Sequence, residues 1–263
     1  MRPAYRNLWL SLMAVCCLAA FSNEVLAKCT DADWTNGSSL VNYAGTIDEK
    51  YSIQMTLVIS GENVTGVYFY QSQLKDIHIK GNLADASSLV LDELDPTGKV
   101  VAKFNAKFVE QDPKGRFGGN DLRCEIIVGT WSKDGKQGLS VYLAEESITI
   151  GTLDHRYEPA GVDNDALIDS NALRFWAAIK NNDKPAVAAQ INYPINVSVS
   201  GHLKKINGVN DLLSNYDAIF TARFREAILK AAPKNMFVNA QGIMLGNGEV
   251  WFGQNGKVIT LNN

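Results

Sequence analysis

Two different spacings of hydrophobic residues divide this chain, and they constrain its fold more than any other feature. From Leu40 to about Tyr157 apolar and polar residues alternate, as in Ile53-Gln-Met-Thr-Leu-Val-Ile59. Alternating side chains lie on opposite faces of a β-strand, so each strand has one apolar face. After Glu158-Pro-Ala-Gly161 the spacing becomes helical. The sequence therefore predicts an α+β protein, with an antiparallel β domain at residues 28–158 and an α+β domain at residues 162–263.

The first domain is predicted to be a meander of about eight strands. Turn sequences separate the alternating runs: Asp95-Pro-Thr-Gly98, Asp112-Pro-Lys-Gly115 and Lys133-Asp-Gly-Lys136. Because helical spacing is absent from this part, the strands must form a small barrel or a curled sheet.

Four aromatic residues of this domain have two interpretations. Tyr68, Tyr70, Trp131 and Tyr142 can line a barrel mouth or a carbohydrate platform, or they can fill the interior of the sheet. The sequence favours the second interpretation, because buried aromatic side chains are common in strands of this kind. His78 alternates with Ile77 and Ile79 and is expected on the solvent face.

The second domain is predicted to contain a helix near Leu173–Lys180 with Asp169 or Ser170 as its N-cap, and a short helix after Asp183. A strand and a turn follow at about residues 193–206. A longer helix is predicted from about Gly208 to Ala231, and Pro233 ends it. Three closing strands are expected at residues 236–245, 249–253 and 257–261.

The first residues have the layout of a secretory signal peptide. Arg2 and Arg6 precede the apolar run from Leu8 to Phe21, and Val25-Leu-Ala27 precedes the expected cleavage site. The apolar run is shorter than the roughly 20 residues of a membrane-spanning helix. We therefore expect residues 1–27 to be removed and the mature chain to reside in the periplasm without a membrane span.

Export leaves two of the four cysteines, Cys29 and Cys124. In an oxidising compartment these two are expected to form one structural disulfide. Their spacing matches no zinc motif, and the chain has only three histidines. We expect no metal site and no cofactor.

Charge and motifs exclude several classes of function. The formal net charge is −3, and lysines and arginines alternate with acidic residues. Binding to nucleic acid is therefore not expected. The sequence lacks a Gly-x-Ser-x-Gly elbow, a His-Glu-x-x-His motif and a phosphate-binding glycine loop. No catalytic residue can be assigned from these patterns.

Both domains resemble known groups of proteins. Tyr43-Ala-Gly-Thr-Ile, Gly66-Val-Tyr-Phe-Tyr and Gly129-Thr-Trp resemble a pattern in exported bacterial β proteins of unassigned function. Four segments and their element order resemble the NTF2-like cone fold, which is related in shape to cystatin-like folds. These segments are Phe175-Trp-Ala-Ala-Ile, Tyr193-Pro-Ile, Tyr216-Asp-Ala-Ile-Phe and Gln241-Gly-Ile-Met-Leu-Gly-Asn-Gly-Glu-Val-Trp-Phe. That resemblance implies a pocket between a curved sheet and helices, which some members use for catalysis and many for binding or dimerisation.

The NTF2-like resemblance directs attention to five residues. Enzymes of that group place an Asp–His or Asp–Arg pair in the cone as acid and base. The candidates for a ligand site here are Tyr216, Asp217, Trp251, His202 and Arg223. In one continuous helix Asp217 and Arg223 would point about 120° apart. They are therefore not expected to act as a catalytic pair.

These observations favour an exported, non-enzymatic binding protein with a protein partner in the cell envelope. An inhibitor or immunity protein against an envelope hydrolase or toxin fits this description. The alternatives are a small-ligand or catalytic pocket in the NTF2-like domain, and a structural or assembly factor of the envelope. A homodimer through the C-terminal sheet is compatible with all three.

Overall fold

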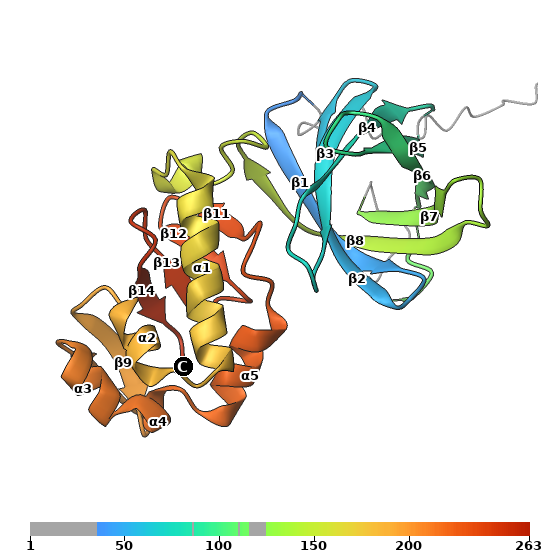
Figure 1. The fold of residues 1–263 in the computed structure, drawn as a ribbon. Helices are drawn as coiled ribbons and strands as arrows, with labels where there is room; N and C mark the ends of the chain where they lie inside the picture. Colours follow the sequence, from blue (N-terminus) through green and yellow to red (C-terminus); the bar gives the residue numbers. More distant parts are fainter. Residues whose placement is uncertain (1–35, 86, 110, 116–124) are drawn as a thin grey trace, which may run out of the picture.

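The computed structural model describes residues 36–85, 87–109, 111–115 and 125–263. The chain forms two units that lie side by side, a β-barrel and an α+β unit (Figure 1). The predicted α+β class with an antiparallel β part is confirmed, and the β part is a closed barrel. The expected signal peptide and both cysteines of the expected disulfide, Cys29 and Cys124, lie outside the described residues.

The barrel is an antiparallel meander in which every strand pairs with its neighbours in sequence. Strand β1 also pairs with β8, with Val41 opposite Ile148, and this pairing closes the barrel. The eight strands are β1 Ser39–Ile47, β2 Tyr51–Ser60, β3 Asn63–Tyr70, β4 Ile77–Leu83, β5 Ser88–Leu94, β6 Val100–Phe108, β7 Ile126–Lys133 and β8 Leu139–Ile150.

The barrel interior is filled by the apolar side chains of the alternating runs. Examples are Ile53, Met55, Leu57 and Ile59 from β2, each at most 1% exposed. A barrel of eight strands is narrow, so its strands must coil tightly. Glycines allow this close approach: a Cβ atom at Gly81 would lie 1.8 Å from the carbonyl oxygen of Val90 on β5.

The α+β unit packs one long helix across a small meander sheet (Figure 1). Its buried core includes Phe175 of the long helix and Phe252 of the sheet, whose ring centroids are 5.9 Å apart. The elements in chain order are η3 Glu158–Ala160, α1 Asp165–Lys180, α2 Lys184–Ala189, β9 Ile195–Val199, β10 His202–Ile206, α3 Val209–Ser214, α4 Tyr216–Ile219, α5 Ala222–Lys230, β11 Phe237–Asn239, β12 Gly242–Leu245, β13 Val250–Phe252 and β14 Val258–Leu261. Strands β11 to β14 form one sheet, and β9 pairs only with β10.

The predicted long helix from Gly208 to Ala231 is wrong, because three short helices replace it. The side chain of Asn215 bonds to the carbonyl oxygen of Asp211 at 2.7 Å and ends α3. Thr221 has an extended ψ of 160° and caps α5 through its hydroxyl, which accepts from the N–H of Phe224. Polar side chains that bond to the local backbone compete with a continuous helix, and the apolar spacing did not reveal this.

Two further expectations are corrected. The predicted first closing strand, residues 236–245, is a hairpin of β11 and β12. In the turn of this hairpin, the side chain of Asn239 accepts a hydrogen bond from the backbone N–H of Gln241. Helix α1 begins at Asp165 with Asn164 as N-cap, about one turn before the predicted caps. Asp169 therefore lies within the helix. No helix among the described residues is long and apolar enough to cross a bilayer.

The close approach at Gly81 predicts a large effect of adding one methyl group. Gly81→Ala should lower the free energy of unfolding by about 3 kcal/mol, because the new Cβ must displace the backbone of β5. Urea denaturation followed by circular dichroism measures this change. The exposed neighbour Lys80→Ala should change stability by less than about 0.5 kcal/mol. Equal effects of the two substitutions would refute this account of the barrel.

Candidate functional site

Arg156 lies at the junction of the two units and is almost fully buried, with 8% of its surface exposed. Its Nη2 is 3.2 Å from a carboxylate oxygen of Asp76, which belongs to the β3–β4 turn of the barrel. Its Nε is 3.7 Å from Asp165 at the start of α1, and its Nη1 donates to Asn235 at 3.2 Å. One side chain therefore contacts the barrel, the long helix and the segment before β11.

Lys234 extends this arrangement into a five-residue group. Its Nζ lies 3.2 Å from Asp76 and 3.3 Å from Asp169. The group, called the junction ion cluster below, consists of Arg156, Lys234, Asp76, Asp165 and Asp169. Three carboxylates face two cations, and the side chains of both cations are at most 15% exposed. Ion pairs this deeply buried hold their partners in defined positions, because breaking one leaves an uncompensated charge.

The surroundings of the junction ion cluster shift several pKa values. Burial raises the pKa of Asp165, while the backbone N–H groups of Arg156 and Tyr157 and the guanidinium of Arg156 oppose this rise. Burial alone lowers the pKa of Arg156, but Tyr157 and the three aspartates raise it above its usual value. Burial also raises the pKa of Tyr157, whose hydroxyl donates to Asp169 at 2.7 Å. The tyrosine therefore stays protonated and anchors α1 to the junction.

Asn235 makes a second connection between the units. Its side-chain amide donates to Asn42 at 3.3 Å and to the hydroxyl of Thr56. Asn42 and Thr56 are register partners on β1 and β2, and the hydroxyl of Thr56 donates to Asn42 at 2.8 Å. The backbone N–H of Met236 donates to the hydroxyl of Tyr157 at 3.1 Å. The segment before β11 is thus held on both sides.

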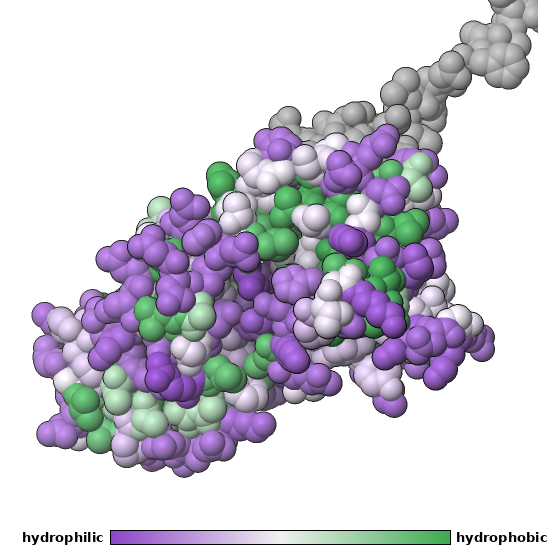
Figure 2. Space-filling view, turned by 45° about the horizontal axis from the view of Figure 1, so that its top comes forward, coloured by the Kyte–Doolittle hydropathy of each residue, from purple (hydrophilic) through white to green (hydrophobic). Residues whose placement is uncertain are grey.

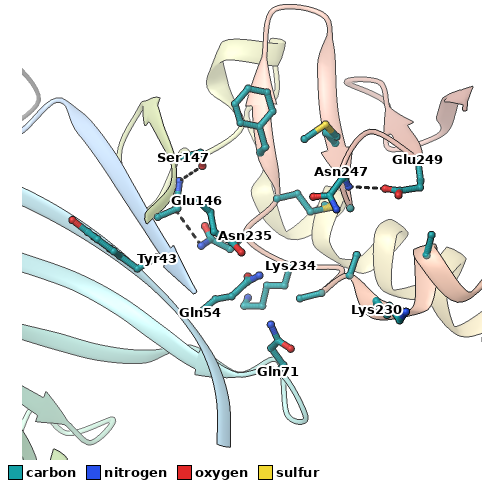
Figure 3. A pocket seen from close by; sticks show the side chains of 18 residues that line it. Tyr43, Gln54, Gln71, Glu146, Ser147, Lys230, Lys234, Asn235, Asn247 and Glu249 are labelled. Carbon is teal, nitrogen blue, oxygen red and sulfur yellow. Dashed lines mark hydrogen bonds between the residues drawn. The ribbon is translucent and has the colours of Figure 1, made fainter. Parts of the chain in front are cut away.

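A cavity of about 440 Å³ opens beside these contacts, between the barrel and the α+β unit. Gln54 and Gln71 of the barrel face Lys234 and Asn235 of the α+β unit across it (Figure 3). Hydrophilic residues also dominate the boundary between the units on the face shown in Figure 2. Of the eighteen lining residues, seven are polar and uncharged, seven are apolar or glycine, and four are charged; the residues are Asn42, Tyr43, Gln54, Gln71, Glu146, Ser147, Ala227, Lys230, Ala231, Ala232, Lys234, Asn235, Met236, Phe237, Met244, Gly246, Asn247 and Glu249.

The charged groups of this cavity already have partners within the protein. Lys230 pairs with Glu226 at 2.8 Å, and Lys234 belongs to the junction ion cluster. Glu249 accepts the N–H of Asn247 at 2.6 Å, and Glu146 also takes part in an interaction. The amide oxygen of Gln54, in contrast, is buried without a hydrogen-bond partner among the described residues. The cavity is therefore suited to an uncharged ligand with hydrogen-bond donors.

The five residues suggested by the NTF2-like resemblance are not brought together. Tyr216 is 1% exposed in the core, where its ring lies 4.6 Å from that of Phe220. Asp217 is exposed and pairs with Lys184 at 2.7 Å. A second, open cavity of about 550 Å³ lies beside α1 and α2. None of the five residues lines this cavity or the junction cavity.

The other three candidates of that set lie on separate elements. His202 is exposed on β10, and Arg223 is exposed on α5. Trp251 is partly exposed on β13, in register with Met244 of β12 and Thr260 of β14. The interior between helices and sheet, where the resemblance implies a pocket, is occupied by Phe175, Phe220 and Phe252. No three metal-ligating side chains gather anywhere in the described ranges.

Three of the four barrel aromatics meet at one end of the barrel. Tyr68 and Trp131 both donate to Glu93, and the ring of Tyr70 lies 5.7 Å from that of Tyr68. Tyr142 lies apart from them and donates to Asp112 at 2.7 Å.

Neither the role of Glu93 nor the junction ion cluster was expected from the sequence. Glu93 could have been found, because it occupies the inward position after Leu89 and Leu91 on β5. For Asp76 and Lys234 no such signal exists, since charged residues in turns normally face solvent.

Comparisons with known proteins give no guide to this chain: no protein-family model, no curated protein and no solved structure matches it. The function must therefore be argued from the geometry of the sites.

Removing the central cation should have a large effect on stability. Arg156→Met should lower the free energy of unfolding by about 3–5 kcal/mol, because Asp165 loses its buried cation and Asp76 loses one of its two. Urea denaturation monitored by fluorescence measures this loss. Lys103→Met breaks the exposed ion pair with Asp92 and should cost less than about 1 kcal/mol. A loss at Arg156 no larger than that at Lys103 would contradict the structural role of the cluster.

Proposed function

We propose that this chain is an exported binding protein whose ligand site is the junction cavity, and that its ligand is an uncharged, N-acetylated oligosaccharide. The observation that carries the proposal is the composition of the cavity lining. Amide side chains line the cavity on both units, while its two lysines form ion pairs within the protein and Glu249 accepts a backbone N–H. A site of this kind distinguishes ligands by the pattern of their hydrogen-bond donors and acceptors and not by their charge.

The chemistry of an acetamido sugar matches this lining. Each primary amide of Asn or Gln offers two N–H donors and a carbonyl acceptor. Sugar hydroxyls and acetamido groups present the complementary donors and acceptors. One part of the wall is apolar, with Met236, Phe237 and Met244, and can cover the apolar face of a sugar ring.

The size and rigidity of the cavity support a compact ligand. A volume of about 440 Å³ lies within the usual range of small-molecule sites, roughly 300–1,000 Å³. The junction ion cluster holds both walls in place, so little ordering is needed when a ligand binds. A preformed cavity of this size suits a disaccharide or trisaccharide better than an extended chain.

The first residues support a location in the envelope. The arrangement of Arg2, Arg6, the apolar run and Ala27 is that of a secretory signal peptide. Acetamido sugars are abundant in bacterial envelopes, so the proposed ligand occurs in the compartment to which the chain is expected to be exported. The proposed inhibitor role towards an envelope hydrolase is compatible with the same site, because such an enzyme and its inhibitor can meet on the same polymer.

The NTF2-like relationship of the second unit is a separate proposal. It is supported by the order of helix pair, hairpin, helices and four-stranded meander, with α1 across the sheet. The aromatic filling of its interior favours the junction cavity over an internal cone as the ligand site. A second copy of the chain, if it docks on the sheet, would meet Trp251, which is in register with Met244; Met244 and Phe237 themselves line the junction cavity.

Titration calorimetry with chitobiose tests the proposal. We expect saturable binding to the full chain, and binding at least about tenfold weaker for cellobiose, which lacks the acetamido groups. Gln54→Leu should weaken chitobiose binding by about tenfold or more without loss of stability, since it removes a buried oxygen that has no donor.

Gln73→Leu is the matched control, because Gln73 is exposed on the β3–β4 turn and does not line the cavity. It should bind chitobiose as the natural chain does. The proposal is wrong if chitobiose fails to bind, or if the two glutamine variants bind it equally.

A further inference from the structure

Glu93 is a buried carboxylate inside one end of the barrel, and it does not line the junction cavity. It follows Leu89 and Leu91 on the inward face of β5 and is 9% exposed. Its Oε2 accepts a hydrogen bond from the hydroxyl of Tyr68 at 2.6 Å and another from the indole N–H of Trp131 at 2.8 Å. Both donors come from other strands, β3 and β7, so the barrel itself fixes the carboxylate.

No positive charge of the described chain compensates Glu93. Among the described residues, its side chain forms no ion pair within 4.0 Å, in contrast to the carboxylates of the junction ion cluster. A buried carboxylate normally has a cationic partner, because two neutral donors offset only part of the lost hydration. Burial and the bond to Glu93 raise the pKa of Tyr68, so this hydroxyl stays protonated and remains a neutral donor.

Aromatic rings gather at the same end of the barrel as Glu93. The rings of Tyr68 and Tyr70 are 5.7 Å apart, and those of Tyr70 and Tyr51 are 6.3 Å apart, both edge to face. Tyr51 is 40% exposed, and Tyr70 and Trp131 are partly exposed. All four turns at this end of the barrel, residues 48–50, 71–76, 95–99 and 134–138, are described. Contacts thus run from the exposed Tyr51 through Tyr70 to Tyr68, which bonds to Glu93; Tyr51, Tyr68, Tyr70, Trp131 and Glu93 are here called the barrel mouth.

The barrel mouth already holds one cation on its rim. The Nζ of Lys50 lies 4.9 Å from the centroid of the Tyr51 ring. Such contacts are favourable because the face of an aromatic ring is electronegative. Rings with electronegative faces, combined with an uncompensated carboxylate behind them, attract an ammonium group and not an anion.

We propose that the barrel mouth binds a small organic ammonium ion, with Glu93 as its counter-ion and Tyr51, Tyr70 and Trp131 as the aromatic wall. This site differs from the junction cavity in position and in charge. Its ligand differs from that of the saccharide proposal, so a separate titration tests each proposal.

Titration calorimetry of the full chain with choline chloride tests this proposal, with dimethylbutanol as the uncharged carbon isostere of choline. Choline should bind saturably and dimethylbutanol should not, because only choline carries the charge. Glu93→Gln should weaken choline binding at least about tenfold, since it keeps the acceptor oxygen and removes the charge. Tyr51→Leu, an exposed position, should weaken it about threefold.

Asp92→Asn is the matched control, because it removes the same charge from the outward face of the same strand. It should bind choline as the natural chain does. Near-ultraviolet circular dichroism checks that Glu93→Gln keeps the barrel intact. Absence of choline binding, equal binding by Glu93→Gln and the natural chain, or equal binding of dimethylbutanol would each overturn the proposal. The chitobiose titration on the same samples reports the junction cavity separately.

Discussion

The buried ion pairs at the junction determine how the two units of this protein are arranged. Asp76 lies on a barrel turn, whereas Arg156 and Lys234 belong to the joining segment and the α+β unit. Each charge is removed from water and depends on its partners, so a shifted arrangement would leave charges buried and uncompensated. Such a cluster contributes less to overall stability than to the choice of one geometry. The shape of the cavity beside it follows from that choice.

The two proposed sites differ in whether their charged groups have charged partners within the protein. In the junction cavity the charges are paired within the protein, which leaves amide groups to select a ligand. In the barrel mouth the carboxylate of Glu93 has only neutral donors, which leaves its charge for a ligand. The β3–β4 turn connects the two sites, because Tyr70 ends the strand in the mouth and Gln71 lines the cavity. Both sites thus depend on one short turn that Asp76 anchors.

Much of the barrel could be predicted from the sequence, since a strand buried on one face requires alternation. The run around Ile53 to Ile59 and the turn at Asp95 are examples, and the strands lie where the alternation places them. Closure into a barrel was one of two predicted outcomes. The long helix was mispredicted, because Asn215 and Thr221 interrupt it through local hydrogen bonds that hydrophobic spacing does not record. The junction was beyond prediction: Asp76 and Arg156 are far apart in sequence, and charged residues in turns are usually solvated.

A double-mutant cycle across the junction tests the central claim most directly. It compares the free energies of unfolding of the natural chain, Asp76→Asn, Lys234→Met and the double variant. Asp76 belongs to the barrel and Lys234 to the α+β unit, with 3.2 Å between their charged atoms. The account predicts a coupling energy above about 1 kcal/mol, because each single variant leaves the other charge buried and poorly compensated. Additive losses, with a coupling below about 0.3 kcal/mol, would show that the cluster does not hold the two units together.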